Sequence, residues 1–146
     1  MRVSKVVLLA LCAALLLSSA ALAEDTVKIG LLVPLTGPAA ADGASALASV
    51  QIALDQVNAD GGVLGKQVEL IYYDDRADTK DAVALAHKLI EQDKIAAFVA
   101  GSYSLPTRSV APIFQEEEVP LVAAYAIHPD VTKAGDFCFR NGFLGL

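Results

Sequence analysis

The stretch "IAAFVAGSYSLPTRSVAPIF", residues 95–114, joins an apolar run to a group of hydroxyl-bearing residues and then to a helical pattern. The first six residues have the length and composition of a buried β-strand, and a helix is expected over 104–117. A buried strand that passes through a glycine into a helix is typical of parallel α/β proteins. This stretch therefore indicates the fold class.

The hydroxyl-bearing residues around the expected helix start are Ser102, Tyr103, Ser104 and Thr107. One interpretation is that they cap the helix. The other is that the unpaired N–H groups at the helix start bind an anionic group such as a carboxylate. Because the proline at position 106 has no N–H, backbone donors would include Leu105 and Thr107. These residues alone leave both interpretations open.

The rest of the chain alternates strands and helices at the same spacing. Apolar residues recur every three or four positions in two further segments, and β-forming residues fill the segments between them. The expected strands are 26–33, 67–74, 95–100, 119–124 and 137–140, and the expected helices are 43–58, 78–92 and 104–117. This order predicts an α/β fold, with a Rossmann-like open parallel sheet covered by helices on both faces, in a single domain.

The first 23 residues have the pattern of a cleaved secretory signal. Two positive charges lie in residues 1–5, an apolar run fills 6–17, and "ALA" precedes Glu24. This pattern predicts cleavage between Ala23 and Glu24, which leaves residues 24–146 as the mature domain. The alternative is a membrane anchor, but the apolar run is shorter than the roughly 20 residues that a spanning helix needs. We expect export to the periplasm.

Charge and side-chain chemistry argue against several classes of protein. The formal net charge is −6, and lysine and arginine do not cluster, so we expect no nucleic-acid partner. Cys12 lies in the expected signal, so the mature domain keeps only Cys138 and forms no internal disulfide. His87 and His128 lack partner ligands at metal-binding spacing, so we expect no metal and no cofactor.

The sequence gives little support to an enzyme. Ser104, His128 and Asp130 are residue types of a hydrolase, but no G-x-S-x-G motif surrounds Ser104. "GGVLGKQ" lacks the spacing of a phosphate-binding loop and precedes a strand. In "YDDRAD" we expect Asp74 and Asp75 to be solvated and the last aspartate to cap the next helix. An exported hydrolase remains the third of our functional hypotheses.

Three segments resemble one known family closely: "KIGLLVPLTGPAAADG" (28–43), "LDQVNADGGVLGKQVELIYYDDRADTKDAVALAHKLI" (54–90) and "GSYSLPTRSVAPIFQEEEVPLVA" (101–123). They look like the periplasmic branched-chain amino acid (leucine) binding proteins of ABC importers, which are type I solute-binding proteins. The resemblance covers residues 26–140. It implies a two-lobed clamp, of which this chain would encode the N-terminal lobe.

The resemblance implies a solute-binding protein without catalysis, whose partners are a small amino-acid-like solute and a membrane permease. An exported ligand-sensing domain of the same fold is the alternative. In the family, residues matching Ser104 to Thr107 hold the solute carboxylate, and the loop matching 125–127 holds its ammonium group. The expected ligand-binding residues are Asp42, Tyr103, Ser104, Leu105, Thr107, Tyr125, Ala126 and Ile127.

Three of these positions depart from the family pattern. Leu105 stands where the family usually has serine, Ile127 where a threonine commonly contacts the ammonium group, and Asp42 where an aromatic residue often lies. The departures broaden the expected solutes from leucine to amino acids and related small carboxylates or amides. Asp42 offers a partner for a cationic group on such a solute.

Overall fold

The computed structural model of the protein describes residues 26–143 and 145, so the expected signal and its cleavage site lie outside the described residues. Strands and helices alternate along this part of the chain, as the sequence predicts. The elements are β1 (Val27–Val33), α2 (Ala40–Ala59), β2 (Val68–Asp74), α3 (Thr79–Glu91), β3 (Ala97–Ala100), α4 (Ser104–Glu116), β4 (Leu121–Ala123), the 3₁₀ helix η2 (Pro129–Ala134) and β5 (Cys138–Arg140).

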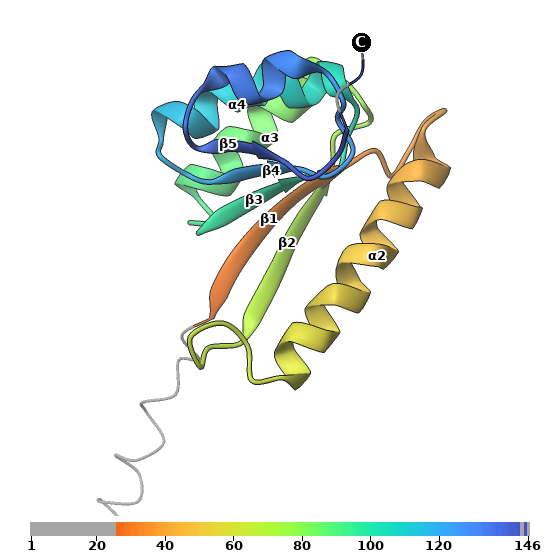
Figure 1. Cartoon of the computed structure of the whole chain (residues 1–146). Helices are drawn as coiled ribbons and strands as arrows, with labels where there is room; N and C mark the ends of the chain where they lie inside the picture. The colour runs from red at the N-terminus through yellow and green to blue at the C-terminus, as the bar shows by residue number, and fades with distance from the viewer. Residues whose placement is uncertain (1–25, 144, 146) are drawn as a thin grey trace, which may run out of the picture.

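The five strands form one parallel sheet in the order β2-β1-β3-β4-β5. Helices α3 and α4 cover one face, and α2 lies on the other (Figure 1). This arrangement confirms the predicted open parallel α/β sheet with helices on both faces. The loops that leave β1, β3 and β4 all emerge at the carboxyl edge of the sheet, where open α/β proteins bind their ligands.

The core lies between the sheet and the pair α3 and α4. The rings of Phe98 in β3 and Phe114 in α4 stack at 4.2 Å between centroids, and both are buried. The apolar side of α3 contributes Ala82, Ala86 and Leu89, as its helical spacing predicts. Asp78 caps this helix by accepting hydrogen bonds from two backbone N–H groups of its first turn, which confirms the expected cap.

Helix α2 is much less buried than α3 and α4. Its one buried residue is Gly43, and a Cβ there would lie 2.0 Å from the carbonyl oxygen of Pro34. The start of α2 therefore packs directly on the loop after β1. Farther along, the predicted apolar face stays half-buried at Leu54 and exposed at Val57.

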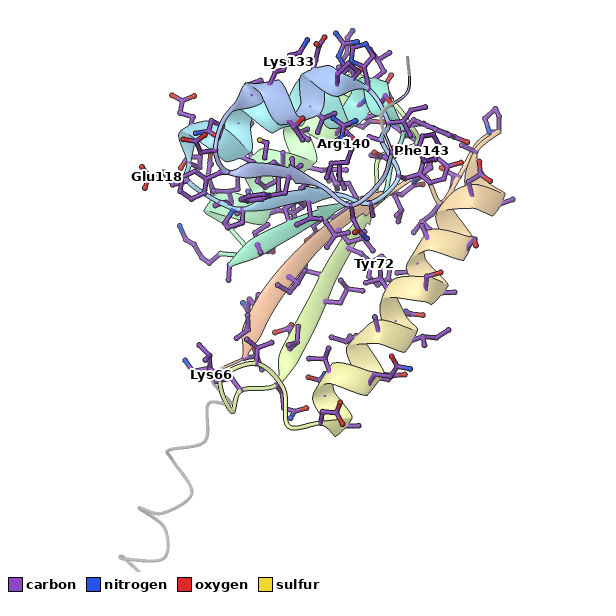
Figure 2. All side chains as sticks on the ribbon, viewed as in Figure 1. Lys66, Tyr72, Glu118, Lys133, Arg140 and Phe143 are labelled. Carbon is purple, nitrogen blue, oxygen red and sulfur yellow. The ribbon has the colours of Figure 1, made fainter. Side chains whose placement is uncertain are left out.

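The sheet face on the side of α2 also keeps apolar side chains accessible. Residues paired across the five strands form one row, and side chains paired in this way point to the same face of a parallel sheet. The row consists of Tyr72, Leu31, Val99, Val122 and Phe139. Tyr72, Val122 and Phe139 are exposed (Tyr72 is labelled in Figure 2).

Two local features differ from the sequence-based expectations. The segment Pro129–Ala134 forms a 3₁₀ helix that the sequence did not indicate. Asp75, expected to be solvated, is fully buried, so that expectation is wrong. Among the described residues, no helix is both long enough and apolar enough to cross a membrane.

Candidate functional site

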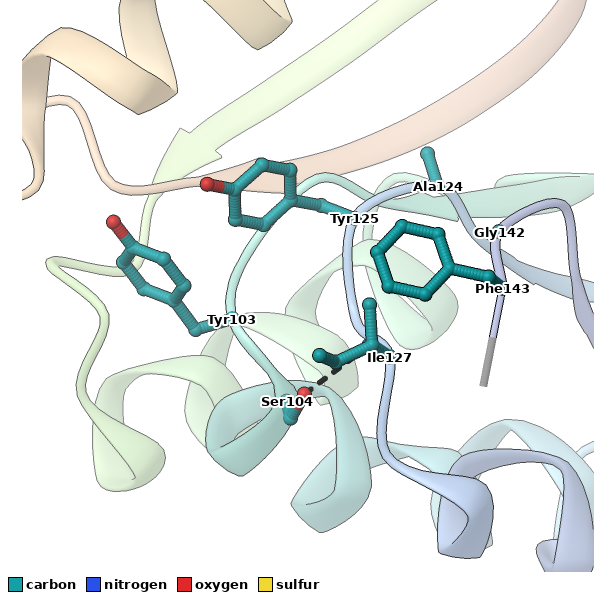
Figure 3. Close-up of a pocket in the computed structure, with 7 residues that line it drawn as sticks. All are labelled: Tyr103, Ser104, Ala124, Tyr125, Ile127, Gly142 and Phe143. Atoms are coloured by element: carbon teal, nitrogen blue, oxygen red, sulfur yellow. Dashed lines mark hydrogen bonds between the residues drawn. The ribbon is translucent and has the colours of Figure 1, made fainter. Parts of the chain in front are cut away.

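Loops at the carboxyl edge of the sheet line an open cavity of about 460 Å³. The loop after β3 and the start of α4 form one wall, the loop after β4 forms another, and residues that follow β5 form a third. The lining residues are Tyr103, Ser104, Ala124, Tyr125, Ile127, Gly142 and Phe143 (Figure 3). The wall is mostly aromatic and aliphatic, and Ser104 contributes a hydroxyl group.

Ser104 is the first residue of α4, and its hydroxyl joins two walls of the cavity. Its Oγ accepts hydrogen bonds from the N–H groups of Ile127 at 3.2 Å and His128 at 3.3 Å (Figure 3 draws the first). Because both bonds use the oxygen as acceptor, the hydroxyl hydrogen remains available to a ligand. The helix begins after Tyr103 without a side-chain cap. The interpretation that these hydroxyls cap α4 is therefore wrong.

Two tyrosines line the cavity beside this serine. The rings of Tyr103 and Tyr125 meet edge to face, with 5.3 Å between their centroids. The Tyr103 hydroxyl donates a hydrogen bond to a carboxylate oxygen of Asp42 in the first turn of α2. This bond, together with desolvation, raises the pKa of Tyr103 to about 12. The phenol therefore stays protonated and links the loop after β3 to α2.

The other expected site residues lie at different depths. Leu105 is 64% exposed at the rim and borders a second groove between α4 and η2. Thr107 in α4 and Ala126 in the loop after β4 are both buried. The Thr107 N–H donates to the carbonyl of Tyr103 at 3.1 Å, so it is not an open donor for a ligand.

Sequence reasoning missed the contribution of the segment after β5. Gly142 and Phe143 line the cavity, and Phe143 is 77% exposed. Arg140 at the end of β5 donates to the carbonyl of Ile127 at 2.6 Å and to the Thr132 hydroxyl at 3.1 Å, which holds the loop after β4 in place. The signal for these residues is topological, because β5 ends at the same edge of the sheet as β3 and β4.

Comparison with known proteins identifies the family. The sequence matches the model of a family described as periplasmic binding protein over residues 26–144. The chain belongs to the periplasmic binding protein family. This result confirms the resemblance seen in the sequence.

Relatives of this periplasmic binding protein bind small solutes. It is 37% identical over 118 residues to a leucine-, isoleucine-, valine-, threonine- and alanine-binding protein of Pseudomonas aeruginosa, in an alignment that covers 81% of this chain and 31% of the relative. The chain spans about a third of the length of the curated relatives it matches.

Solved structures give the same result for the fold. The branched-chain amino acid transporter substrate-binding protein of Streptococcus pneumoniae, in complex with isoleucine, superposes with a TM-score of 0.78 at 32% identity, over 82% of this chain and 34% of that one. A solute-binding protein of Rhodopseudomonas palustris, in complex with 3,4-dihydroxybenzoic acid, superposes with a TM-score of 0.75 at 29% identity. That superposition covers 83% of this chain and 33% of the other. These two relatives are described as a substrate-binding protein and as a solute-binding protein of an ABC transporter.

Among the described residues of this periplasmic binding protein, no base is hydrogen-bonded to Ser104. In the part of the chain that the structure describes, Ser104 pairs with backbone N–H groups, whereas the ring of His128 accepts from the N–H of Asp130 at 3.2 Å. The described residues also contain no cluster of three potential metal ligands. The arrangement is suited to hydrogen bonding and apolar contact.

Proposed function

We propose that this protein is the solute-binding component of an ABC importer, which works in the periplasm and delivers its solute to a membrane permease without catalysis. The solute is an amino acid or a related small carboxylate. The observation that carries this proposal is the Ser104 hydroxyl, which two backbone N–H groups fix inside a largely apolar cavity at the carboxyl edge of the sheet.

The solute carboxylate would lie at the start of α4. There it accepts the Ser104 hydroxyl hydrogen and the N–H of Leu105, which lies in the first turn and has no helical partner. The positive end of the helix dipole favours the same group. The body of the solute then packs against Tyr125, Ile127 and Phe143, whose side chains are exposed.

The range of solutes follows from the lining. Ile127 offers an apolar side chain in the cavity where the family usually has a hydroxyl, and three aromatic rings line the cavity. Leu105, which also replaces a hydroxyl, offers its side chain at the neighbouring groove. We therefore include small aromatic carboxylates with the branched-chain and other apolar amino acids. Relatives in complex with isoleucine and with 3,4-dihydroxybenzoic acid support this range. Asp42 supplies negative charge beside Tyr103 for a solute that carries an ammonium group.

We further propose that residues 24–146 form the first lobe of a two-lobed clamp. The relatives that match this chain are about three times as long. A second lobe over the cavity would cover Phe143 and Tyr125 and expel water from around Ser104. Removal of water strengthens each polar contact, because the local dielectric constant falls.

A thermal-shift screen tests the function. Apolar amino acids, their amides and hydroxybenzoates are added to the protein, and at least one should raise its melting temperature in proportion to the logarithm of its concentration. Ser104→Ala should reduce this shift, whereas Ser109→Ala, a change in the same helix outside the cavity, should preserve it. A flat response to every solute would contradict the proposal.

A further inference from the structure

Beneath the candidate site lies a small void with two unpartnered polar atoms. The carboxylate atom Oδ2 of Asp75 and the hydroxyl oxygen of Ser102 are both buried and neither has a hydrogen-bond partner. Both residues line the same void, which has no room for a water molecule. A buried polar atom without a partner costs stability, so this pair requires an explanation.

The surroundings of Asp75 favour its neutral form. The void is lined by Leu32 of β1, Ala82 of α3, Phe98 of β3 and Val110 of α4, none of which carries a charge. The remaining carboxylate oxygen of Asp75 accepts one bond, from the N–H of Ala77 at 3.1 Å.

Burial raises the pKa of Asp75. The N–H of Ala77 offsets part of this rise, and the negative charge of Asp74 adds to it. Asp74 shows the opposite balance, because hydrogen bonds from Thr36, Arg76 and Leu35 outweigh its desolvation and lower its pKa. The pKa values of these two adjacent aspartates are therefore shifted in opposite directions.

We propose that Asp75 stays protonated at pH values at which the exposed aspartates are ionised. It shares its proton with the Ser102 hydroxyl, and it acts as a positioning residue for the loop that carries Tyr103 and Ser104. A protonated carboxyl can donate through Oδ2, so a single bond to the Ser102 hydroxyl oxygen would satisfy both unpartnered atoms. Ser102 follows β3 directly and precedes the two site residues. The bond therefore fixes the position from which the Ser104 hydroxyl reaches the loop after β4.

The positioning role rests on the proposed function, because the loop matters to a solute only if the cavity binds one. Its test needs no solute. The carboxyl carbon of each aspartate is followed by ¹³C NMR across a pH series in the chain, together with the amide signals of Ser104, Ile127 and His128. Asp75 should titrate at a higher pH than Asp74 and Asp78, whose pKa values are lowered. The three amide signals should shift with the same midpoint as Asp75.

Variants separate this role from simple packing. Asp75→Asn keeps the shape and a donor, so it should remove the pH step from the three amide signals. Asp55→Asn, on the exposed side of α2, should leave that step unchanged. Ser102→Ala removes the proposed partner of the Asp75 carboxyl, so it should change the Asp75 midpoint and uncouple that midpoint from the three amide signals.

Stability gives a second measurement. With its pKa raised, Asp75 keeps its proton in the folded state while the unfolded chain releases it above pH 3.8. Wild type should therefore lose stability relative to Asp75→Asn as pH rises above that value, until Asp75 ionises in the folded state too. A midpoint for Asp75 at or below that of Asp74 would overturn the proposal, as would amide signals that do not follow Asp75. Both outcomes are independent of whether any solute binds.

Discussion

Ser104→Ala distinguishes the two roles assigned to the Ser104 hydroxyl, which are to hold the loop after β4 and to bind the solute. The change removes an acceptor that serves the N–H groups of Ile127 and His128, at 3.2 and 3.3 Å. Both distances lie at the long end for hydrogen bonds to backbone N–H, and the site is partly exposed. We therefore assign about 0.5 kcal/mol to each bond, or about 1 kcal/mol in all. For a domain of this size, that loss lowers the melting temperature by about 4 °C.

The effect on a bound carboxylate should be larger than the effect on stability. The hydroxyl hydrogen of Ser104 would donate to a charged acceptor, and such a bond contributes about 1.5–3 kcal/mol. Affinity should therefore fall about tenfold to a hundredfold. Calorimetry of wild type and variant measures this difference, and urea unfolding followed by circular dichroism measures the stability.

Ser109→Ala is the matched control for both measurements. The Ser109 hydroxyl donates to the carbonyl of Leu105 within α4, at 2.9 Å, and does not line the cavity. Its loss should have little effect on either stability or affinity. If Ser104→Ala behaved like this control in both assays, the assigned role of the hydroxyl would be wrong.

Four further changes test other parts of the structure. Phe114→Ala should cost about 3–5 kcal/mol in urea unfolding, because it removes the ring stacked on Phe98 in the core, whereas Phe143→Ala should leave stability unchanged and weaken solute binding. Asp78→Ala should destabilise α3 at neutral pH. Hydrogen bonds from the helix start lower the pKa of Asp78, so the difference from wild type should vanish as pH falls through that lowered value. Tyr103→Phe should remove an absorbance step near pH 12 from a spectrophotometric titration; persistence of that step would refute the pairing with Asp42.

Much of the fold could be predicted because local signals agreed with one another. In α3 the helical spacing of apolar residues and the cap at Asp78 mark the same segment, and the short apolar runs mark the buried strands. Boundaries were less predictable. Helix α2 begins at Ala40, before Gly43, because the glycine permits the close approach to Pro34 that fixes the start of the helix.

The site was only partly predictable, because its walls come from distant segments. The position of Tyr103 and Ser104 directly after a strand predicts that they belong to the site. The role of Phe143 instead depends on where β5 lies in the sheet. The burial of Asp75 could not be predicted from the sequence either. In sequence it stands among charged residues, and only the packing of α3 and α4 removes it from water.

The most direct test of solute binding at this cavity is a ¹⁵N NMR titration of the chain with apolar amino acids and hydroxybenzoates at millimolar concentrations. A solute that binds as proposed should shift the amide signals of Ser104, Tyr125 and Phe143 in a saturable way, and Ser104→Ala should weaken the response about tenfold or more. Saturable shifts confined to other parts of the chain, or no shift at these residues with any solute, would show that the cavity is not the binding site.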